Sequence, residues 1–316
     1  MSSSSRHLSA LAFPFVLALA GSGCSGGDAG PGVQGEGVVG AFLVTMNSDF
    51  TPVVATISGA VNNAPANDLV VWEQAAKEGS CVLQKPRVPF CSTPCGSGNQ
   101  CVEDDTCKPE AVGKDIGAVT VKGVKTAAGA TEVALTSTLP GGYGTATALA
   151  YPPFTEGDDV SYEVAAGGPY GAFSAHTKAI AELVVPKAAI PMEKDKALQL
   201  TWNAKGAAGT STIHVHLDIS HHGGTKGQIE CDAADSGTLA IAAPLVTQLI
   251  NLGVSGFPTV RLTRSSVGSA KVALGTIELR AEQSAERAIV VPGIVSCTGD
   301  EECPTGQTCQ ADLQCK

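Results

Sequence analysis

Histidine is the residue type in this chain whose spacing points most directly to chemistry. His214, His216 and Asp218 alternate with apolar residues, so an extended strand would carry all three on one face. His214 and His216 would lie roughly 6.5–7 Å apart at Cα, close enough for two imidazoles to reach one metal ion. His221 and His222 follow closely and could fold back as further ligands. Zinc or copper would suit such nitrogen ligands, and the competing interpretation is a solvated strand face beside a glycine turn.

The cysteines form two groups with different chemistry. Of the 11 cysteines, Cys24 stands alone near the N-terminus and the other ten form an even set, which in an exported chain indicates disulfides. Zinc is the competing interpretation, but structural zinc sites prefer Cys-x2-Cys pairs, and no such pair occurs in the sequence. The ten are Cys81, Cys91, Cys95, Cys101, Cys107, Cys231, Cys297, Cys303, Cys309 and Cys315.

Two of the cysteine clusters repeat one another. Residues 95–107 and 303–315 share a glycine three residues after the first cysteine and a Cys-x5-Cys ending. Segments this small cannot bury a useful core, so cross-links must stabilise them. If each module closes internally, Cys81 and Cys231 remain to pair with each other. In the alternative, Cys81 pairs within its own cluster and Cys231 bonds to one of the other four cysteines there.

The sequence carries none of the common catalytic signatures. It contains no Gly-x-Ser-x-Gly elbow, no His-Glu-x-x-His, no Walker loop and no dinucleotide-binding glycine fingerprint. Ser174 and His176 share one predicted strand face, but no third residue that would orient them is evident. The chain is therefore predicted not to be an enzyme and to need no cofactor. A hydrolase of another class is the remaining enzymatic alternative.

The N-terminus is predicted to be an export signal. An apolar run from Leu8 to Ala20 and three small residues precede Cys24. About a dozen apolar residues are too few to span a bilayer, so residues 1–23 are predicted to be a cleaved signal peptide. Residues 19–24 resemble the lipobox of bacterial lipoproteins, although Gly21 stands where leucine is usual. A plain secretory signal is the alternative, but it would leave Cys24 as a reactive free thiol.

Residues 24–37 are predicted to be a flexible tether. They are rich in glycine and nearly free of apolar side chains, which gives a root-mean-square reach of about 20 Å. With a lipid on Cys24, the tether would hold the folded part close to a membrane of the cell envelope, and the outer membrane is the one expected. The expected partners are this membrane and a protein, peptide or glycan ligand.

Composition limits the classes of partner. Charged residues make up 16% of the chain and aromatic residues 4%, with 37 glycines and 18 prolines, which suits short strands and many turns. The formal net charge is −10, and no basic cluster offsets it. A surface of this charge repels phosphate backbones and anionic lipids, which argues against nucleic acid as a partner and against electrostatic membrane binding.

The hydrophobic pattern predicts an all-β fold. Short runs rich in Val, Ile and Phe recur between turn residues, and the segment 244–253 alone has the pattern of a short helix. We expect two antiparallel, immunoglobulin-like β-sandwich units in series, with a single large sandwich as the alternative. A parity shift across Gly275 predicts a β-bulge there. The expected parts are a signal peptide (1–23), a tether (24–37), a β-sandwich (38–186) with a cysteine-rich insert (81–109), a second β-sandwich (187–295) and a C-terminal four-cysteine module (296–316).

The C-terminal module resembles the four-cysteine repeats that end lipoproteins of gliding, spore-forming Gram-negative soil bacteria. Four further stretches resemble one such uncharacterised, cysteine-rich family: 71–73, 89–91, 221–224 and 253–258. The resemblance implies a surface lipoprotein and carries over no catalytic or binding residue. The leading hypothesis is a surface-anchored, non-enzymatic lipoprotein with a binding or cell-envelope structural role, in which an exposed aromatic patch at Tyr143, Tyr151 or Tyr170 would favour ligand binding. The alternative is a periplasmic zinc- or copper-binding protein that uses His214, His216, His221 and His222.

Overall fold

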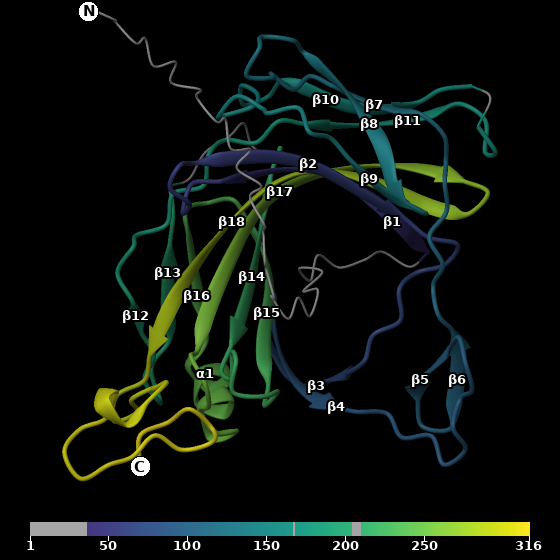
Figure 1. Ribbon diagram of the computed structural model, residues 1–316. Coiled ribbons are helices and arrows are strands. Elements are labelled where there is room, and N and C mark those ends of the chain that lie inside the picture. The colour runs from purple at the N-terminus through teal and green to yellow at the C-terminus, as the bar shows by residue number, and fades with distance from the viewer. Residues whose placement is uncertain (1–36, 167, 204–209) are drawn as a thin grey trace, which may run out of the picture. The chain divides into compact units, whose positions relative to one another are not determined.

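The computed structural model describes residues 37–166, 168–203 and 210–316. The predicted signal peptide, Cys24 and the tether up to residue 36 lie outside these ranges. Almost every regular element is a strand (Figure 1), which confirms the all-β class. The one α-helix of the described residues, α1 (Ala243–Asn251), lies where the sequence predicted it. Within the described ranges, no helix has the length and apolar character needed to cross a membrane.

One hydrogen-bonded sheet of 14 strands runs through the described residues in the order β11-β10-β7-β8-β9-β2-β1-β18-β17-β14-β15-β4-β3, with β12 paired to β18. Its pairs are antiparallel except β1 with β18 and β12 with β18. The immunoglobulin-like units are not confirmed, because this single path joins both halves of the chain. The strands of the sheet are β1 (Val38–Asn47), β2 (Val54–Val61), β3 (Val71–Glu78), β4 (Cys81–Arg87), β7 (Val119–Lys122), β8 (Glu132–Leu139), β9 (Gly142–Gly144), β10 (Asp159–Val164), β11 (Phe173–Lys178), β12 (Ile190–Pro191), β14 (Thr212–Asp218), β15 (Gln228–Ala234), β17 (Thr259–Val272) and β18 (Gly275–Val290).

Two small sheets complete the described strands. One pairs β13 (Leu198–Thr201) with β16 (Thr238–Ile241), and the other pairs β5 (Asn99–Glu103) with β6 (Thr106–Pro109) inside the first cysteine module. A single 3-10 turn, η1 (Asp300–Glu302), lies in the C-terminal module.

The long hairpin of β17 and β18 connects two hydrophobic cores. Ile277, Leu279 and Ala281 from β18 belong to a first core, with side chains of β1, β2, β7, β8, β10 and β11. Ala285 and Ile289 from the same strand belong to a second core, with side chains of β4, β13, β14, β15, β16 and α1. All five residues of β18 are odd-numbered, so both cores lie on the same face of the hairpin. Consequently β3 and β4, which precede the predicted boundary at residue 186, take part in the second half of the structure.

Glycines shape the first half at two points. Gly275 does not form the predicted bulge: β17 ends at Val272, which pairs with Gly275 across the hairpin turn, so the parity shift marks a change of strand. The sheet also curls back on itself, because β11 crosses β17 beside Gly268. A Cβ atom at Gly268 would lie 1.7 Å from the carbonyl oxygen of His176, so only glycine permits this approach.

Arg264 and Gln283 form a polar layer between the two cores. The segment 179–186 passes from one core to the other and needs partners for its buried backbone groups. Gln283 accepts a hydrogen bond from the backbone N–H of Leu183 (2.8 Å) and donates to its carbonyl oxygen (3.2 Å). Arg264, which is fully buried, donates to the carbonyl oxygen of Glu182 (2.8 Å). The charge of Arg264 is balanced by Asp235, with Nε and Oδ2 2.7 Å apart.

Arg287 extends this layer toward the second core. Its guanidinium donates to the carbonyl oxygens of Val185 (2.9 Å) and Pro186 (2.8 Å) and pairs with Asp49 at 2.8 Å. Three side chains of one hairpin therefore hold the connecting segment, at positions that would otherwise be apolar.

All ten cysteines outside the N-terminal region are joined in disulfides, which confirms the disulfide framework. Cys81 is bonded to Cys231, the bridge that the sequence analysis preferred, and it joins neighbouring strands β4 and β15 in the second core. Disulfides persist in oxidising compartments, so the chain is an exported or extracellular protein. Each module closes internally, through Cys91–Cys101, Cys95–Cys107, Cys297–Cys309 and Cys303–Cys315.

The C-terminal module is docked on the second half of the structure at Gly256. The N–H of Gly256 donates to the carbonyl oxygen of Asp312 (2.8 Å), and its own carbonyl accepts from Ser296 (2.6 Å) and Gln314 (2.7 Å). Gly256 has φ +57°, and an added Cβ would lie 2.0 Å from the carbonyl oxygen of His221. The loops 219–224 and 253–258, which carry two of the stretches quoted for the family resemblance, therefore pack backbone to backbone.

Replacement of Arg264 by methionine is expected to destabilise the whole structure. The substitution removes a buried charge from its ion pair with Asp235, which typically costs about 3–5 kcal/mol of unfolding free energy. The measurement is the free energy of unfolding from denaturant titration. Lys122→Met, which removes the exposed ion pair with Glu163, is the matched control and should cost no more than about 1 kcal/mol. Equal losses in the two variants would contradict a central role for the polar layer.

Candidate functional site

The face of the sheet opposite the two cores carries mostly polar residues on β14, β15, β17 and β18. Since both cores lie on one side of β17 and β18, the residues of opposite parity share the other side. Strand register aligns them in rows: His216 faces Glu230 on β15 and Arg261 on β17, and Asp218 faces Gln228. We call this surface the polar sheet face. Its residues in the second half are Trp72, Gln74, Gln84, His214, His216, Asp218, Gln228, Glu230, Asp232, Arg261, Thr263, Ser284 and Glu286.

Glu230 is the centre of the closest cluster on this face. Its Oε1 lies 2.6 Å from Nδ1 of His216 and accepts a hydrogen bond from Nε2 of Gln228 at 2.8 Å. Its Oε2 lies 2.8 Å from Nε2 of His214, although the angles are not those of a hydrogen bond. The other nitrogen of His214 lies 2.9 Å from Oδ1 of Asp232. The Glu230 and His214 side chains are 14% and 13% exposed, so water screens their interaction only partly.

The electrostatics of this cluster favour an imidazolium beside a carboxylate. Burial disfavours the charged form of His214, but the close Glu230 carboxylate and the hydrogen bond with Asp232 outweigh burial and raise the pKa of His214. Burial likewise disfavours the charged form of Glu230, but the close approach of His214 and the hydrogen bond with His216 outweigh it and lower the pKa of Glu230. Both ring nitrogens of His214 face a carboxylate. This suits an imidazolium, in which both nitrogens carry a proton.

The structure brings together two of the four histidines predicted as metal ligands. His214 and His216 both contact Glu230, whereas His221 lies 3.9 Å from Oδ2 of Asp218 and packs against the ring of His222 at a centroid distance of 3.9 Å. The sequence could not show that Glu230 contacts both of them, because the register of β15 against β14 decides which residues face each other. In the described residues, the triads close enough for a shared metal ion are sulfur triads, and those sulfurs are in disulfides.

A row of amides and one tryptophan continue the polar sheet face toward the edge strand. Gln228 donates to Oε1 of Gln84 at 2.9 Å, and Gln84 faces Gln74 on β3. Trp72 lies in the next row on the same face, opposite Pro86. Planar amides beside an aromatic ring are groups that hydrogen-bond and stack against a polar ligand. Sequence analysis missed Trp72 and the glutamines, because only the register of β4 against β15 places them on the same sheet face as the histidines.

The other candidate residues lie elsewhere. Tyr143 is buried in the first core, where its hydroxyl donates to Asp115 at 2.9 Å, so it forms no exposed patch. Tyr151 and Tyr170 pack against the same core, and Tyr151 donates to Glu182 at 2.9 Å. Ser174 and His176 approach to 3.4 Å on the exposed face of β11.

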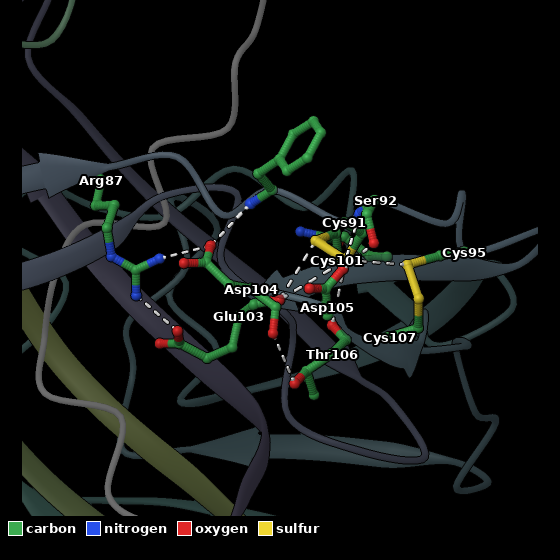
Figure 2. The surroundings of a disulfide bond; sticks show 12 residues. Arg87, Cys91, Ser92, Cys95, Cys101, Glu103, Asp104, Asp105, Thr106 and Cys107 are labelled. Atoms are coloured by element: carbon green, nitrogen blue, oxygen red, sulfur yellow. Dashed lines mark hydrogen bonds and ion pairs between the residues drawn. A yellow bond between two sulfur atoms is a disulfide. The ribbon is translucent and has the colours of Figure 1, made fainter.

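The first cysteine module is held to the β3–β4 hairpin by one arginine. The guanidinium of Arg87 reaches Glu73 (2.6 Å) on the hairpin and Glu103 (2.6 Å) and Asp104 (2.9 Å) on the module. Figure 2 shows the last two contacts beside the Cys91–Cys101 and Cys95–Cys107 disulfides. Hydrogen bonds to Glu103 and Glu73 raise the pKa of Arg87. None of residues 91–107 belongs to either core.

No protein-family model and no curated protein matches the chain. Among solved structures, the chain aligns with the crystal structure of a tetra-tandem repeat in the extending region of a large adhesion protein. The two are 11% identical, the alignment covers 82% of this chain and 76% of that chain, and the TM-score is 0.18. A TM-score this low does not establish a common fold.

The His214–Glu230 pair is expected to make stability depend on pH. A raised pKa of His214 stabilises the fold below the unfolded value of 6.5, and this contribution is lost as pH rises through the folded value. A lowered pKa of Glu230 stabilises the fold above 4.5, and this contribution is lost as pH falls through the folded value. The unfolding free energy lost in His214→Gln should therefore be largest between these two pH values and smaller at pH 9.

Denaturant titrations at several pH values measure this difference. His176→Gln, which alters an exposed histidine of β11 outside this cluster, is the matched control. An effect of His214→Gln that is constant from pH 5 to 9 would contradict the charged pair.

Proposed function

We propose that the protein is a surface-anchored, non-enzymatic lipoprotein that binds a ligand through the polar sheet face. The observation that carries the proposal is this face itself, which both cores leave free and on which charged, amide and aromatic side chains are aligned in rows. Trp72 adds an aromatic ring to the same face, on the edge strand β3. The ligand is a polar molecule such as a glycan or peptide, because the groups on offer are hydrogen-bond donors and acceptors with one stacking platform.

The anchor is the second part of the proposal. The apolar N-terminal run, the small residues before Cys24 and the glycine-rich tether support a lipid on Cys24 and attachment to the cell envelope, with the outer membrane as the membrane expected. Five disulfides agree with this compartment. The resemblance to uncharacterised surface lipoproteins of gliding soil bacteria points the same way.

Lipidation is tested by expression in a lipidating Gram-negative host. The intact mass of the mature chain should begin at Cys24, include acyl chains and be ten hydrogens lighter than the fully reduced form. Cys24→Ser should remove the acyl mass and leave the disulfide count unchanged. An intact mass that retains residues 1–23, or a wild-type chain that is soluble, would contradict the anchor.

Metal binding is the second candidate function, and one observation favours it. Nε2 of His214 and Oε2 of Glu230 are buried and 2.8 Å apart without hydrogen-bond geometry, an arrangement compatible with two ligands directed at a common third atom. His216 on the other oxygen of Glu230 would supply a third ligand after a change of rotamer. Zinc or copper suits this donor set.

Native mass spectrometry of protein purified without chelator tests this candidate. One zinc or copper ion per chain, lost in the His214→Ala, His216→Ala double variant but kept in His221→Ala, would support a metal centre at Glu230. A metal-free wild type that also fails to take up added zinc would leave ligand binding by the polar sheet face as the function.

A further inference from the structure

Exposed apolar side chains gather along one edge of the structure. Val112 and Leu139 lie close to the point where the described chain begins. The backbone N–H of Asn62 donates to the carbonyl oxygen of Val39, and the N–H of Asn63 donates to the carbonyl oxygen of Val112 (2.9 Å). Gly113 lies so close to Pro140 that a Cβ atom on Gly113 would be 1.9 Å from the Pro140 carbonyl oxygen. Val112 is 56% exposed and Leu139 72%.

Three more exposed apolar residues continue this edge toward the first cysteine module. Asn67 donates to the carbonyl oxygen of Pro109 at 2.9 Å, and Gln100 donates to that of Asp68 at 3.0 Å, so the chain before β3 runs beside the module. Val71 pairs with Arg87, which places Leu69 beside the residues that follow β4. Leu69, Val88 and Phe90 are 75%, 74% and 72% exposed. We call Leu69, Val88, Phe90, Val112 and Leu139 the apolar edge.

The apolar edge is held in place rather than loosely attached. The backbone N–H of Phe90 donates to Oδ1 of Asp104 at 3.0 Å, and Asp104 is itself held by Arg87 (Figure 2). Two disulfides fix the module immediately after Phe90. Because the backbone that carries these apolar groups is already fixed, covering them costs little conformational entropy. This favours binding of a partner at the apolar edge.

The length and end point of the tether indicate what covers this edge. Gly37 joins the tether to β1, whose first residues lie beside Asn62 and Val112. A lipid on Cys24 would hold the membrane within about 20 Å of this point. The other end of β1, with the exposed Phe50, is about 30 Å further away, since each strand residue advances roughly 3.3 Å. The apolar edge is thus on the side of the molecule nearest the anchoring membrane.

Local charge agrees with a lipid surface. The chain as a whole has a formal net charge of −10, yet residues 85–114 contain four basic and four acidic residues and are neutral. Glu103 and Asp104 are paired with Arg87, and Asp105 accepts hydrogen bonds from Ser92. An anionic bilayer would therefore repel most of the protein surface but not this segment.

We infer that the apolar edge rests on the lipid bilayer in which Cys24 is anchored, so that the protein stands in a fixed orientation on the membrane. The inference rests on the proposed lipid anchor. Five side chains are too few to bind a free protein tightly, but a short tether raises the effective concentration of the membrane to the millimolar range or above, at which weak contacts suffice. The orientation would leave the far end of β1 directed away from the bilayer.

The test compares two matched tryptophan substitutions in the full, lipidated chain. Phe90→Trp lies on the apolar edge and Phe50→Trp at the far end of β1, and both positions are exposed phenylalanines. Each variant is reconstituted into phosphatidylethanolamine–phosphatidylcholine vesicles with brominated acyl chains, and the wild-type emission of Trp72 and Trp202 is subtracted. We expect the Phe90→Trp emission to shift to shorter wavelength and fall about twofold, because an interfacial ring lies roughly 5–10 Å into the headgroup boundary. The Phe50→Trp emission should not change.

The outcomes separate the orientation from the anchor. Loss of co-flotation of the wild type with vesicles, or absence of acyl mass, would overturn the anchor and with it the basis of this inference. Co-flotation with no quenching at either position, or equal quenching at both, would leave the anchor intact and overturn the orientation. Phe90→Trp emission that shifts in a concentration-dependent way without lipid would also overturn it, because a second copy of the chain would then cover the edge.

Discussion

A buried layer of charged and amide side chains between two hydrophobic cores is the constraint on which the rest of the structure depends. Arg264 and Gln283 occupy core-facing positions of the long hairpin, where they supply hydrogen-bond partners to the segment 179–186. Without them, the backbone groups of that segment would be buried and unpaired at a cost comparable to several hydrogen bonds. The layer therefore fixes where the chain passes from one core to the other, and it requires Asp235 nearby to balance the arginine.

Placing both cores on one side of the hairpin has a consequence for the opposite face. Positions of the other parity on β14, β15, β17 and β18 are left without a core to cover them, and most of them are polar. Charged groups at close range must then neutralise one another, as His214 and Glu230 do through opposite shifts of their pKa values. The cluster around Glu230, in which the charges stabilise one another, also offers a ligand directional contacts. We therefore place the binding function there.

The two cysteine modules share a pattern but not a role. The C-terminal module docks through backbone contacts at Gly256, and Cys297 within it is fully buried. The first module is joined to the sheet through Arg87 and remains exposed, next to apolar side chains that no part of the described chain covers. Disulfides explain how each module keeps its shape, whereas the surroundings decide whether it completes the fold or presents a surface.

Composition and local pattern sufficed for the all-β class, the single helix and the disulfide framework, because each depends on residue type and spacing along the chain. The bridge from Cys81 to Cys231 was the preferred pairing, but only the adjacency of β4 and β15 decides it. The period of two correctly placed His214 and His216 on one face of β14. Gln84 and Trp72 could not be placed on the same face as them, since the pairing of β4 with β15 joins residues more than a hundred positions apart. Glu230 is near in sequence, but its place opposite His216 depends on the register of β15 against β14. The same reason explains why Gly275 was read as a bulge and two separate sandwiches were expected: a local pattern does not show that one hairpin serves both cores. Only the tertiary structure decides that, because the buried partners of Arg264 and Gln283 come from segments distant in the chain.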